Sequence, residues 1–247
     1  MRKLSHLQKD DLGLDVTRAD DGKTDILRKS AVFSDLNKQQ CLRLSRLGVE
    51  HHVKLGQFMY SEADLLEYFY VVAEGRLKIL KHSPSGKDVI VAFSGPGEIL
   101  GNVSLSSEKP HFYSAQAVLD TKVLAIKSDD LRTFLSNDLQ VGFEVLRKML
   151  LVADQRLTSA LRRLVDLAAE RAEHRLAYTL FTLSSEVGCT LPFTRQEVAQ
   201  MAGTTTETAI RFVSRLKKAG VVRAPRRKIH IIDQAKLGLL FGDLPQA

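Results

Sequence analysis

A repeat of apolar residues every seven positions runs through residues 139–167 and is the strongest constraint on the fold. One position of the repeat holds Leu139, Leu146, Ala153, Ala160 and Leu167, and the other holds Phe143, Leu150, Leu157 and Leu164. No Gly or Pro interrupts the segment after Gly142. A repeat of this kind over about four heptads predicts one long helix with the seam of a coiled coil.

A second apolar stripe lies beside this seam on the same predicted helix. It consists of Val145, Met149, Val152 and Leu161. Either the helix buries a single stripe in its own domain, or one stripe docks on that domain while the other pairs with a second copy of the chain. We favour the second arrangement, as a parallel homodimer. The expected dimer contacts are Phe143, Leu146, Leu150, Ala153, Leu157, Ala160, Leu164 and Leu167.

Short segments with strand character alternate with turn residues between residues 51 and 127. Pro84, Ser85 and Gly86 mark one hairpin turn, and Gly95 and Pro96 mark another. Short and evenly spaced strands predict an antiparallel β-roll or barrel. With the helices predicted before and after it, the fold class is α+β.

The chain divides into four parts on these patterns. Residues 1–24 are a polar N-terminal extension that we expect to be partly disordered. Residues 25–137 form the β-roll domain, which begins with two short helices, and residues 138–168 form the dimerisation helix. Residues 169–247 form a separate C-terminal domain.

Within the C-terminal domain, residues 193–222 predict two short helices joined by a tight turn. Thr194 and Glu197 make a capping box, Gly203 ends the first helix, and the second runs from about Thr206 to Ala219. Its apolar stripe is Ala209, Phe212, Val213 and Leu216, and its other face carries Glu207, Thr208, Arg211, Ser214, Arg215, Lys217 and Lys218. A basic second helix after a glycine turn is typical of a helix-turn-helix that enters the DNA major groove. An ordinary helical hairpin on a protein surface is the alternative.

Residues 221–233 predict a two-stranded wing with Arg226, Arg227 and Lys228 near its tip. The tip residues suit contact with phosphate, although a solvated charged turn has the same composition. The expected DNA contacts are Thr194, Arg195, Thr205, Thr206, Glu207, Thr208, Arg211, Arg215, Arg226, Arg227 and Lys228. The interface is therefore expected to combine base contacts from the second helix with phosphate contacts from the wing.

The charge distribution supports an anionic partner. The net charge is +7, and residues 168–247 hold 12 Lys/Arg against 7 Asp/Glu, while residues 1–167 hold 24 against 22. The excess of positive charge therefore lies in the domain that carries the predicted helix-turn-helix.

Several classes of protein are disfavoured by what the sequence lacks. We find no apolar run of about 18 residues and no signal-peptide core, which predicts a cytoplasmic protein without membrane contact. A Gly-rich phosphate loop, a zinc motif and a nucleophile elbow are also missing, so we expect no enzyme and no metal site. Cys41 and Cys189 are best interpreted as inert thiols, with redox sensing as the alternative.

Four motifs resemble those of the CRP/FNR superfamily of bacterial transcription regulators. The strand pair is Val72-x-x-Gly75-x-Leu77-x-Ile79, and the turn is Pro96-Gly97-Glu98-Ile99-Leu100-Gly101. The opening of the C-terminal domain is Arg175-Leu176-Ala177, and the helix-turn-helix signature is Thr194-Arg195-Gln196-Glu197-Val198-Ala199 with Gly203 and Glu207-Thr208-x-x-Arg211. The resemblance covers about residues 25–240. It implies a β-roll that senses an effector, a homodimer, a palindromic DNA site and RNA polymerase as a partner.

The resemblance also implies that Glu207 and Arg211 read a G·C pair in each half-site. Residues four apart lie on one helix face, where Arg can bind guanine and Glu can accept from cytosine. A surface ion pair between the two is the alternative. Thr206 stands where many relatives carry a further specificity residue, so the preference at the neighbouring base stays open. A winged helix that binds protein instead of DNA is a remoter alternative.

The effector site departs from the pattern of cyclic-nucleotide binders. Such relatives follow the turn with Gly-Glu and later carry Arg-Ser, whereas this chain has Gly101-Asn102 and Tyr113-Ser114. No Arg lies in residues 83–126, and a buried phosphate without a cation is costly. We therefore expect that cyclic AMP is not the effector. The N-terminal cysteine cluster of the iron–sulfur branch is missing as well.

The expected pocket residues are Gly101, Asn102, Val103, Phe112, Tyr113, Ser114, Ala160 and Leu161. Two interpretations stay open: a small apolar effector or haem binds there, or Phe112 and Tyr113 fill the pocket and the regulator needs no ligand. His111 is a possible haem ligand, but a solvated loop histidine is the favoured interpretation.

Overall fold

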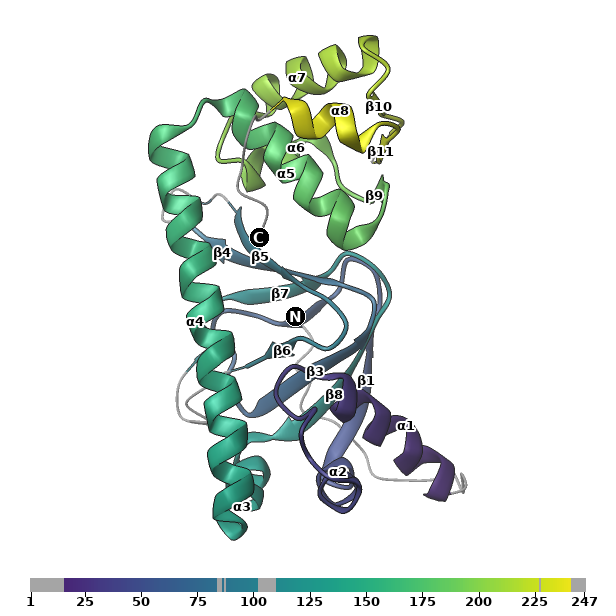
Figure 1. Ribbon diagram of the computed structural model, residues 1–247, viewed down its shortest axis with the longest axis vertical. Coiled ribbons are helices and arrows are strands. Elements are labelled where there is room, and N and C mark those ends of the chain that lie inside the picture. The colour runs from purple at the N-terminus through teal and green to yellow at the C-terminus, as the bar shows by residue number, and fades with distance from the viewer. Residues whose placement is uncertain (1–15, 84–85, 87, 102–109, 227, 241–247) are drawn as a thin grey trace.

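The computed structural model describes residues 16–83, 86, 88–101, 110–226 and 228–240. It contains a β-roll with short helices at one end, a long helix beside the roll, and a small C-terminal domain at the far end of that helix (Figure 1). The predicted α+β class is confirmed. The predicted site residues Asn102, Val103 and Arg227 lie outside the described residues.

Two helices precede the roll: α1 (Val16–Lys29) and α2 (Lys38–Ser45). Helix α1 begins within the polar extension that is expected to be partly disordered, and residues 16–24 of that extension are helical, while residues 1–15 lie outside the described residues. Leu27 is fully buried at its end, and Arg28 and Lys29 lie in the last turn, where positive charge favours the helix dipole. These anchoring residues follow the polar segment, so the composition of residues 1–24 does not indicate them.

The roll consists of two four-stranded antiparallel sheets, with strand orders β1-β8-β3-β6 and β2-β7-β4-β5. The strands are β1 (Gly48–Val53), β2 (Phe58–Tyr60), β3 (Tyr68–Glu74), β4 (Leu77–His82), β5 (Asp88–Ser94), β6 (Ile99–Leu100), β7 (Ser114–Ala117) and β8 (Thr121–Lys127). Gly75 turns the chain between β3 and β4 with a φ of 82°. A Cβ there would lie 2.3 Å from the carbonyl oxygen of Asp120, so only glycine fits.

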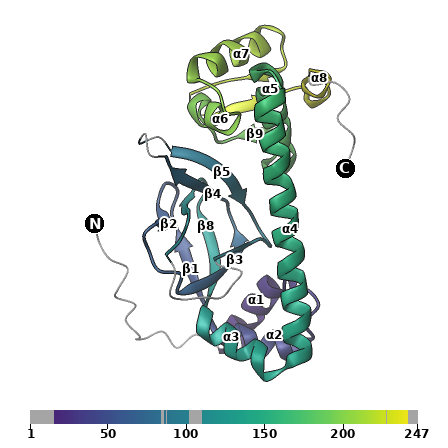
Figure 2. The ribbon, with the colours of Figure 1, turned by 90° about the vertical axis from the view of Figure 1, so that its left-hand side faces the viewer.

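Helix α3 (Ser128–Asn137) leads into α4 (Leu139–Ala169), the predicted long helix, which spans 31 residues. Figure 2 shows α4 running along one side of the roll. Val145 and Met149 are buried against the roll and its N-terminal helices, and Val152 is partly buried. Leu161 is exposed, so it does not continue this stripe. Arg156 and Arg163 follow Met149 at intervals of seven residues and take its place on the face toward the roll.

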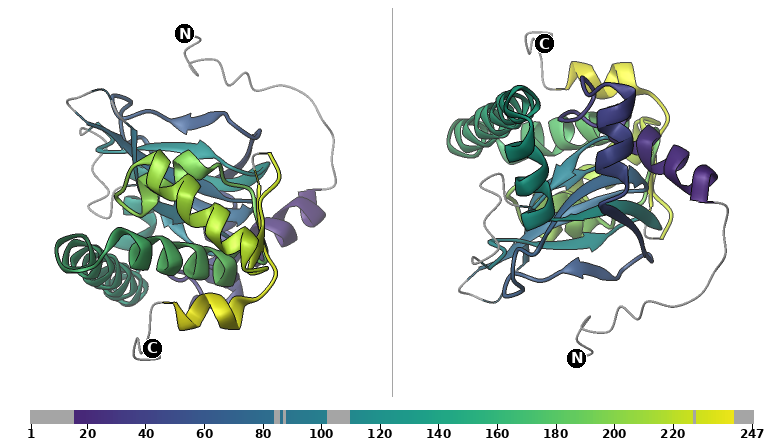
Figure 3. Two further views of the ribbon diagram at one scale, coloured as in Figure 1. Left: turned by 90° about the horizontal axis from the view of Figure 1, so that it is seen from above. Right: turned by 90° about the horizontal axis from the view of Figure 1, so that it is seen from below.

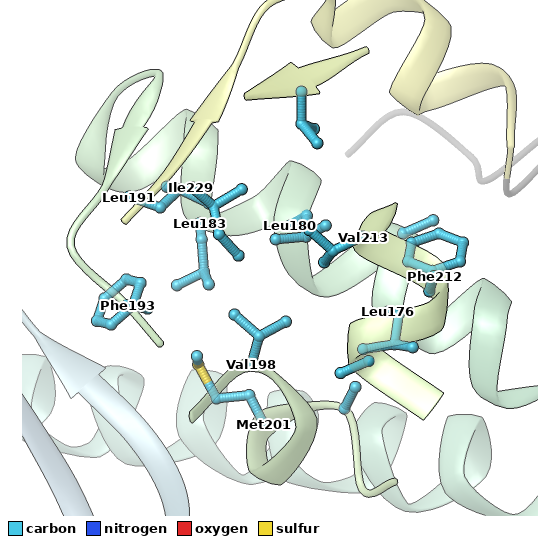
Figure 4. Packing of buried hydrophobic residues seen from close by; sticks show 14 of the residues in the cluster. Leu176, Leu180, Leu183, Leu191, Phe193, Val198, Met201, Phe212, Val213 and Ile229 are labelled. Atoms are coloured by element: carbon cyan, nitrogen blue, oxygen red, sulfur yellow. The ribbon is translucent and has the colours of Figure 1, made fainter. Parts of the chain in front are cut away.

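The C-terminal domain contains α5 (Ala172–Val187), β9 (Thr190–Leu191), α6 (Arg195–Met201), α7 (Thr206–Lys218), β10 (Val222–Arg223), β11 (Ile229–Ile231) and α8 (Gln234–Leu239). The predicted wing is present as β10 and β11, and β9 adds a third strand beside β11. Leu176, Phe193, Val198 and Phe212 belong to the core shared by α5, α6 and α7 (Figure 4). No helix in the described part of the chain is long and apolar enough to span a membrane.

Candidate nucleic-acid interface

The helix-turn-helix begins at the predicted capping box. Glu197 N donates to Thr194 Oγ1 at 3.2 Å, and Thr194 N donates to Glu197 Oε2 at 2.9 Å. Gly203 makes the turn with a φ of 59°, and a Cβ there would lie 2.2 Å from Leu167 Cδ2. The turn therefore favours glycine for its backbone conformation, and Leu167 at the end of α4 packs close to it.

The predicted recognition helix is α7, and Thr205 caps it by accepting from Thr208 N at 3.2 Å. The predicted apolar stripe is confirmed, since Ala209, Phe212, Val213 and Leu216 are all buried. Thr206, Glu207 and Arg211 are exposed on the opposite side. Seen from above, α7 lies across the outer end of the molecule, with α4 viewed nearly end-on (Figure 3). The exposed face of α7 is therefore not covered by the roll.

Glu207 and Arg211 share this exposed face one helical turn apart. Within the described residues, no hydrogen bond or ion pair joins the two side chains. The alternative of a surface ion pair is thus not what the structure shows. Both side chains lie in the first two turns of α7, the part of the recognition helix that reaches base edges in helix-turn-helix proteins.

Two of the other predicted contact residues are already held within the chain. Arg215 Nη2 lies 2.6 Å from Glu173 Oε2 on α5, and its guanidinium lies over the Phe212 ring. Arg195 Nη2 donates to the carbonyl oxygen of Ala224 at 2.9 Å and so ties α6 to the base of the wing. Arg226 and Lys228 are exposed at the wing tip, as expected.

An ion pair that no sequence pattern indicates joins the helix-turn-helix to the roll. Lys78 Nζ on β4 lies 3.0 Å from Glu197 Oε1, and the side chains are only 16% and 21% exposed. The carboxylate therefore caps α6 with one oxygen and binds the roll with the other. Burial alone would raise the pKa of Glu197, but hydrogen bonds from Thr194 and Lys78 hold the pKa below its ordinary value.

Arg163 of α4 makes a second link at the opposite end of α6. Its guanidinium donates to the carbonyl oxygen of Met201 at 3.1 Å and to the carbonyl oxygens of Ile90 and Val91 in β5. Burial lowers the pKa of Arg163. Phe93 of β5 also packs on Phe193, with ring centroids 4.9 Å apart. The roll and α4 thus hold α6 near both of its ends.

The predicted pocket residues are spread over different environments. Gly101 has a φ of 109°, and a Cβ there would lie 2.9 Å from the carbonyl oxygen of Tyr68. Ser114 is buried, and its hydroxyl accepts from Glu62 N at 3.0 Å. Ala160 is exposed on α4, as is Leu161. The two α4 residues expected in the pocket therefore do not face the roll within one chain.

Phe112 and Tyr113 do not fill a pocket, because they are 64% and 39% exposed. Their rings pack edge to face, and the Lys81 ammonium lies 4.0 Å from the Phe112 ring centroid. Lys81 also donates to the carbonyl oxygen of Phe112 and forms an ion pair with Glu62. The hydrogen bond from Lys81 lowers the pKa of the Glu62 carboxyl.

Two cations from outside residues 83–126 contact this part of the roll. Lys81 is one, and Arg156 is the other, since its Nη2 donates to the carbonyl oxygen of Ile99 at 2.5 Å, close to Gly101 in sequence. The spacing of seven from Met149 would have placed Arg156 on the face toward the roll. Both cations are thus already engaged within the chain.

His111 is buried and not solvated as expected. Its ring stacks on Tyr60 with centroids 3.6 Å apart and an interplanar angle of 8°. Burial lowers the pKa of His111 to about 4. The ring is therefore packed in the wall of the roll. Cys41 is buried too, and burial raises the pKa of its thiol, which fits an inert thiol; Cys189 is exposed.

Comparison with known proteins agrees with this arrangement. The cyclic nucleotide-binding domain family matches residues 50–138, and the Crp-like helix-turn-helix domain family matches residues 174–240. The nitrogen fixation regulation protein FixK of Bradyrhizobium diazoefficiens is 29% identical over 222 residues, which cover 87% of this chain and 91% of that protein. The cyclic AMP receptor protein of Thermus thermophilus is 30% identical over 190 residues, covering 74% of this chain and 83% of that protein.

Among solved structures, FixK2 from Bradyrhizobium japonicum is similar with a TM-score of 0.66 and 26% identity, covering 81% of this chain and 99% of that one. The β-roll, the winged helix-turn-helix and these matches define a class of DNA-binding transcription regulators and not of enzymes. The chain belongs to the CRP/FNR family.

Proposed function

We propose that the chain is a homodimeric regulator that binds a palindromic DNA site under the control of a small effector. The observation that carries the dimer is the uncovered seam of α4. Phe143, Leu150 and Leu164 are 66%, 69% and 66% exposed, and they share one face of a single helix. A contiguous apolar face of this kind marks a protein interface, and the heptad spacing fits a second copy of the same helix.

Pairing through α4 presents two copies of α7 to one DNA duplex. Half-sites about one helical turn apart are then expected, with inverted symmetry. The exposed Glu207 and Arg211 would read a G·C pair in each half-site. Selection of bound duplexes from a random library tests this proposal. Enrichment of an inverted repeat supports it, and enrichment of an isolated half-site or of no sequence contradicts it.

Three observations support an effector other than a cyclic nucleotide, although relatives include a cyclic AMP receptor protein. Tyr113 stands where those proteins carry Arg, the Ser114 hydroxyl is already engaged by Glu62 N, and Glu62 also neutralises Lys81. A phosphate would have to break these contacts. We propose a small apolar or aromatic effector, because the exposed Phe112 and Tyr113 rings offer surface for it and do not fill the site themselves.

The effector proposal is tested with protein purified from its host. Native mass spectrometry should show a bound small molecule, and cyclic AMP should leave the melting temperature of the ligand-depleted protein unchanged. A clear rise in melting temperature with cyclic AMP contradicts the proposal. RNA polymerase as a partner and a cytoplasmic location belong to the same proposal, since both follow from the likeness to regulators of this family.

A further inference from the structure

A carboxylate on α5 reaches the recognition helix. Glu173 lies in the first turn of α5, and its Oε2 is 2.6 Å from Arg215 Nη2 in the third turn of α7. The side chains are 56% and 59% exposed, so the pair lies on the surface of the C-terminal domain. Among the cations of α7 in the described part of the chain, Arg215 forms an ion pair, whereas Arg211 forms none.

The surroundings of Glu173 are strongly positive. The hydrogen bond from Arg215 lowers the pKa of Glu173, and the charges of Arg215, Arg211 and Arg171 act in the same direction. Glu173 is therefore ionised at neutral pH, and its negative charge lies near the positive charges of three arginines. This arrangement reduces the positive potential on the side of α7 that bears its basic residues.

Arg215 lies where a phosphate contact is expected. It follows Arg211 by four residues, so the two side chains lie on neighbouring parts of one helix face. In helix-turn-helix proteins the first turns of the recognition helix reach the bases, and later residues lie closer to the DNA backbone. Contacts to phosphate supply affinity for any sequence, and they carry no information about the bases.

We propose that Glu173 limits non-specific DNA binding by neutralising Arg215, and thereby raises the ratio of specific to non-specific affinity. The inference rests on the proposed DNA contact of α7. A cation that is already paired displaces fewer counterions when DNA arrives, so it contributes less to sequence-independent binding. No residue that the structure describes forms an ion pair with Glu207 or Arg211, and both stay available for base edges. Glu173 is thus a specificity-determining residue that contacts no base.

The opposite role would give the opposite result. If Glu173 instead held Arg215 in position to bind phosphate, its removal would weaken binding to every sequence. Glu173→Gln distinguishes the two roles, because glutamine keeps the shape of the side chain and removes its charge. Folding should be almost unaffected, since exposed ion pairs contribute little to stability; thermal unfolding checks this.

The experiment compares the full-length wild type and Glu173→Gln on two probes: the duplex enriched by the wild type from a random library, and a mixed-sequence duplex of the same length. Affinities are measured over a series of salt concentrations. For Glu173→Gln we expect the logarithmic salt slope to steepen by about 0.9 per protomer, which corresponds to tighter mixed-sequence binding on the order of tenfold at low salt. The enriched duplex should gain less, so the specificity ratio should fall.

Glu170→Gln is the matched control. It removes the same charge three positions earlier, and the Glu170 carboxylate lies 3.5 Å from His174 on α5. It should change the salt slope much less than Glu173→Gln does. The double variant Glu173→Gln with Arg215→Gln should return to the wild-type slope, because the cation that Glu173 neutralises is then gone.

Three results would overturn the inference: an unchanged slope in Glu173→Gln, weaker binding of both probes, or an equal effect in Glu170→Gln. These three results bear on the inference only when the wild type prefers its enriched duplex over the mixed-sequence duplex. A wild type that enriches no sequence contradicts the proposed function itself, so the two failures are distinguished.

Discussion

The Lys78 ammonium lies 3.0 Å from the Glu197 carboxylate and joins strand β4 of the roll to helix α6 of the DNA-binding domain. The same carboxylate caps α6 through Thr194. Together with the Arg163 guanidinium at the Met201 carbonyl, this contact fixes how the helix-turn-helix sits on the roll. A change within the roll that moves β4 would therefore act directly on the first helix of the DNA-binding motif.

Replacing Lys78 by Gln tests this link. The variant leaves a mostly buried Glu197 carboxylate without its cation, so we expect the free energy of unfolding to fall by about 1–2 kcal/mol. Proteolysis between α4 and α5 should also become faster, because the C-terminal domain is held less firmly. Chemical denaturation and limited proteolysis provide the measurements.

Lys54→Gln is the control for Lys78→Gln. It removes the same charge from an ion pair with Asp120 whose side chains are 72% and 68% exposed. Exposed pairs of this kind contribute about 0–1 kcal/mol, so stability and proteolysis should hardly change. Equal effects of the two substitutions would show that the contact between the roll and α6 is not a stabilising link.

The stability of the protein should decrease in acid through His111. Burial lowers the pKa of His111 to about 4, whereas an unfolded histidine has a pKa of about 6.5. The unfolded state therefore binds the proton first, and the free energy of unfolding should fall by about 1–3 kcal/mol as pH drops from 6.5 through 4. His111→Phe keeps a ring against Tyr60 and should flatten this part of the pH profile in urea titrations.

The exposed His52 provides the comparison for that experiment. His52→Gln should retain the pH dependence of the wild type. If His111→Phe also retains the full loss of stability between pH 6.5 and 4, the acid sensitivity has another origin, and the burial of His111 is not its cause.

The dimer proposal predicts that charges on the exposed seam of α4 separate the protomers. Leu150 and Leu157 are both exposed in the single chain, so replacing both by Lys should leave the monomer folded. Sedimentation equilibrium should then show a monomer, and affinity for an inverted repeat should fall because the half-sites bind independently. Gln155→Lys with Thr158→Lys adds the same charge to α4 outside both apolar stripes and should stay dimeric. A dimeric Leu150/Leu157 variant contradicts the heptad interpretation.

Features set by neighbouring residues were predictable from sequence. The Thr194–Glu197 capping box, the glycine turn at Gly203 and the buried stripe of α7 depend on spacings of a few residues, and all three are confirmed. The antiparallel β-roll was predictable as a fold class, because short segments with strand character alternate with turn residues along the sequence. Its strand order depends on pairing between distant segments.

Contacts that depend on docking were not predictable in the same way. Lys78 and Glu197 are 119 residues apart, and nothing near either residue indicates the other. The burial of His111 depends on Tyr60, and its position beside a loop suggested solvent instead. Arg156 and Arg163 are an intermediate case. Their spacing of seven residues from Met149 indicates the face toward the roll, but the predicted second stripe continued to Leu161 instead.

We propose that Glu207 and Arg211 read a G·C pair in each half-site. Binding-site selection with the wild type and Arg211→Ala tests it most directly, with Ser214→Ala on the exposed side of the same helix as the control. Arg211→Ala is expected to lose discrimination at one G·C position in each half-site, at a cost of about 1–3 kcal/mol per half-site, while Ser214→Ala keeps it. An unchanged sequence preference in Arg211→Ala would show that Arg211 does not read this base pair.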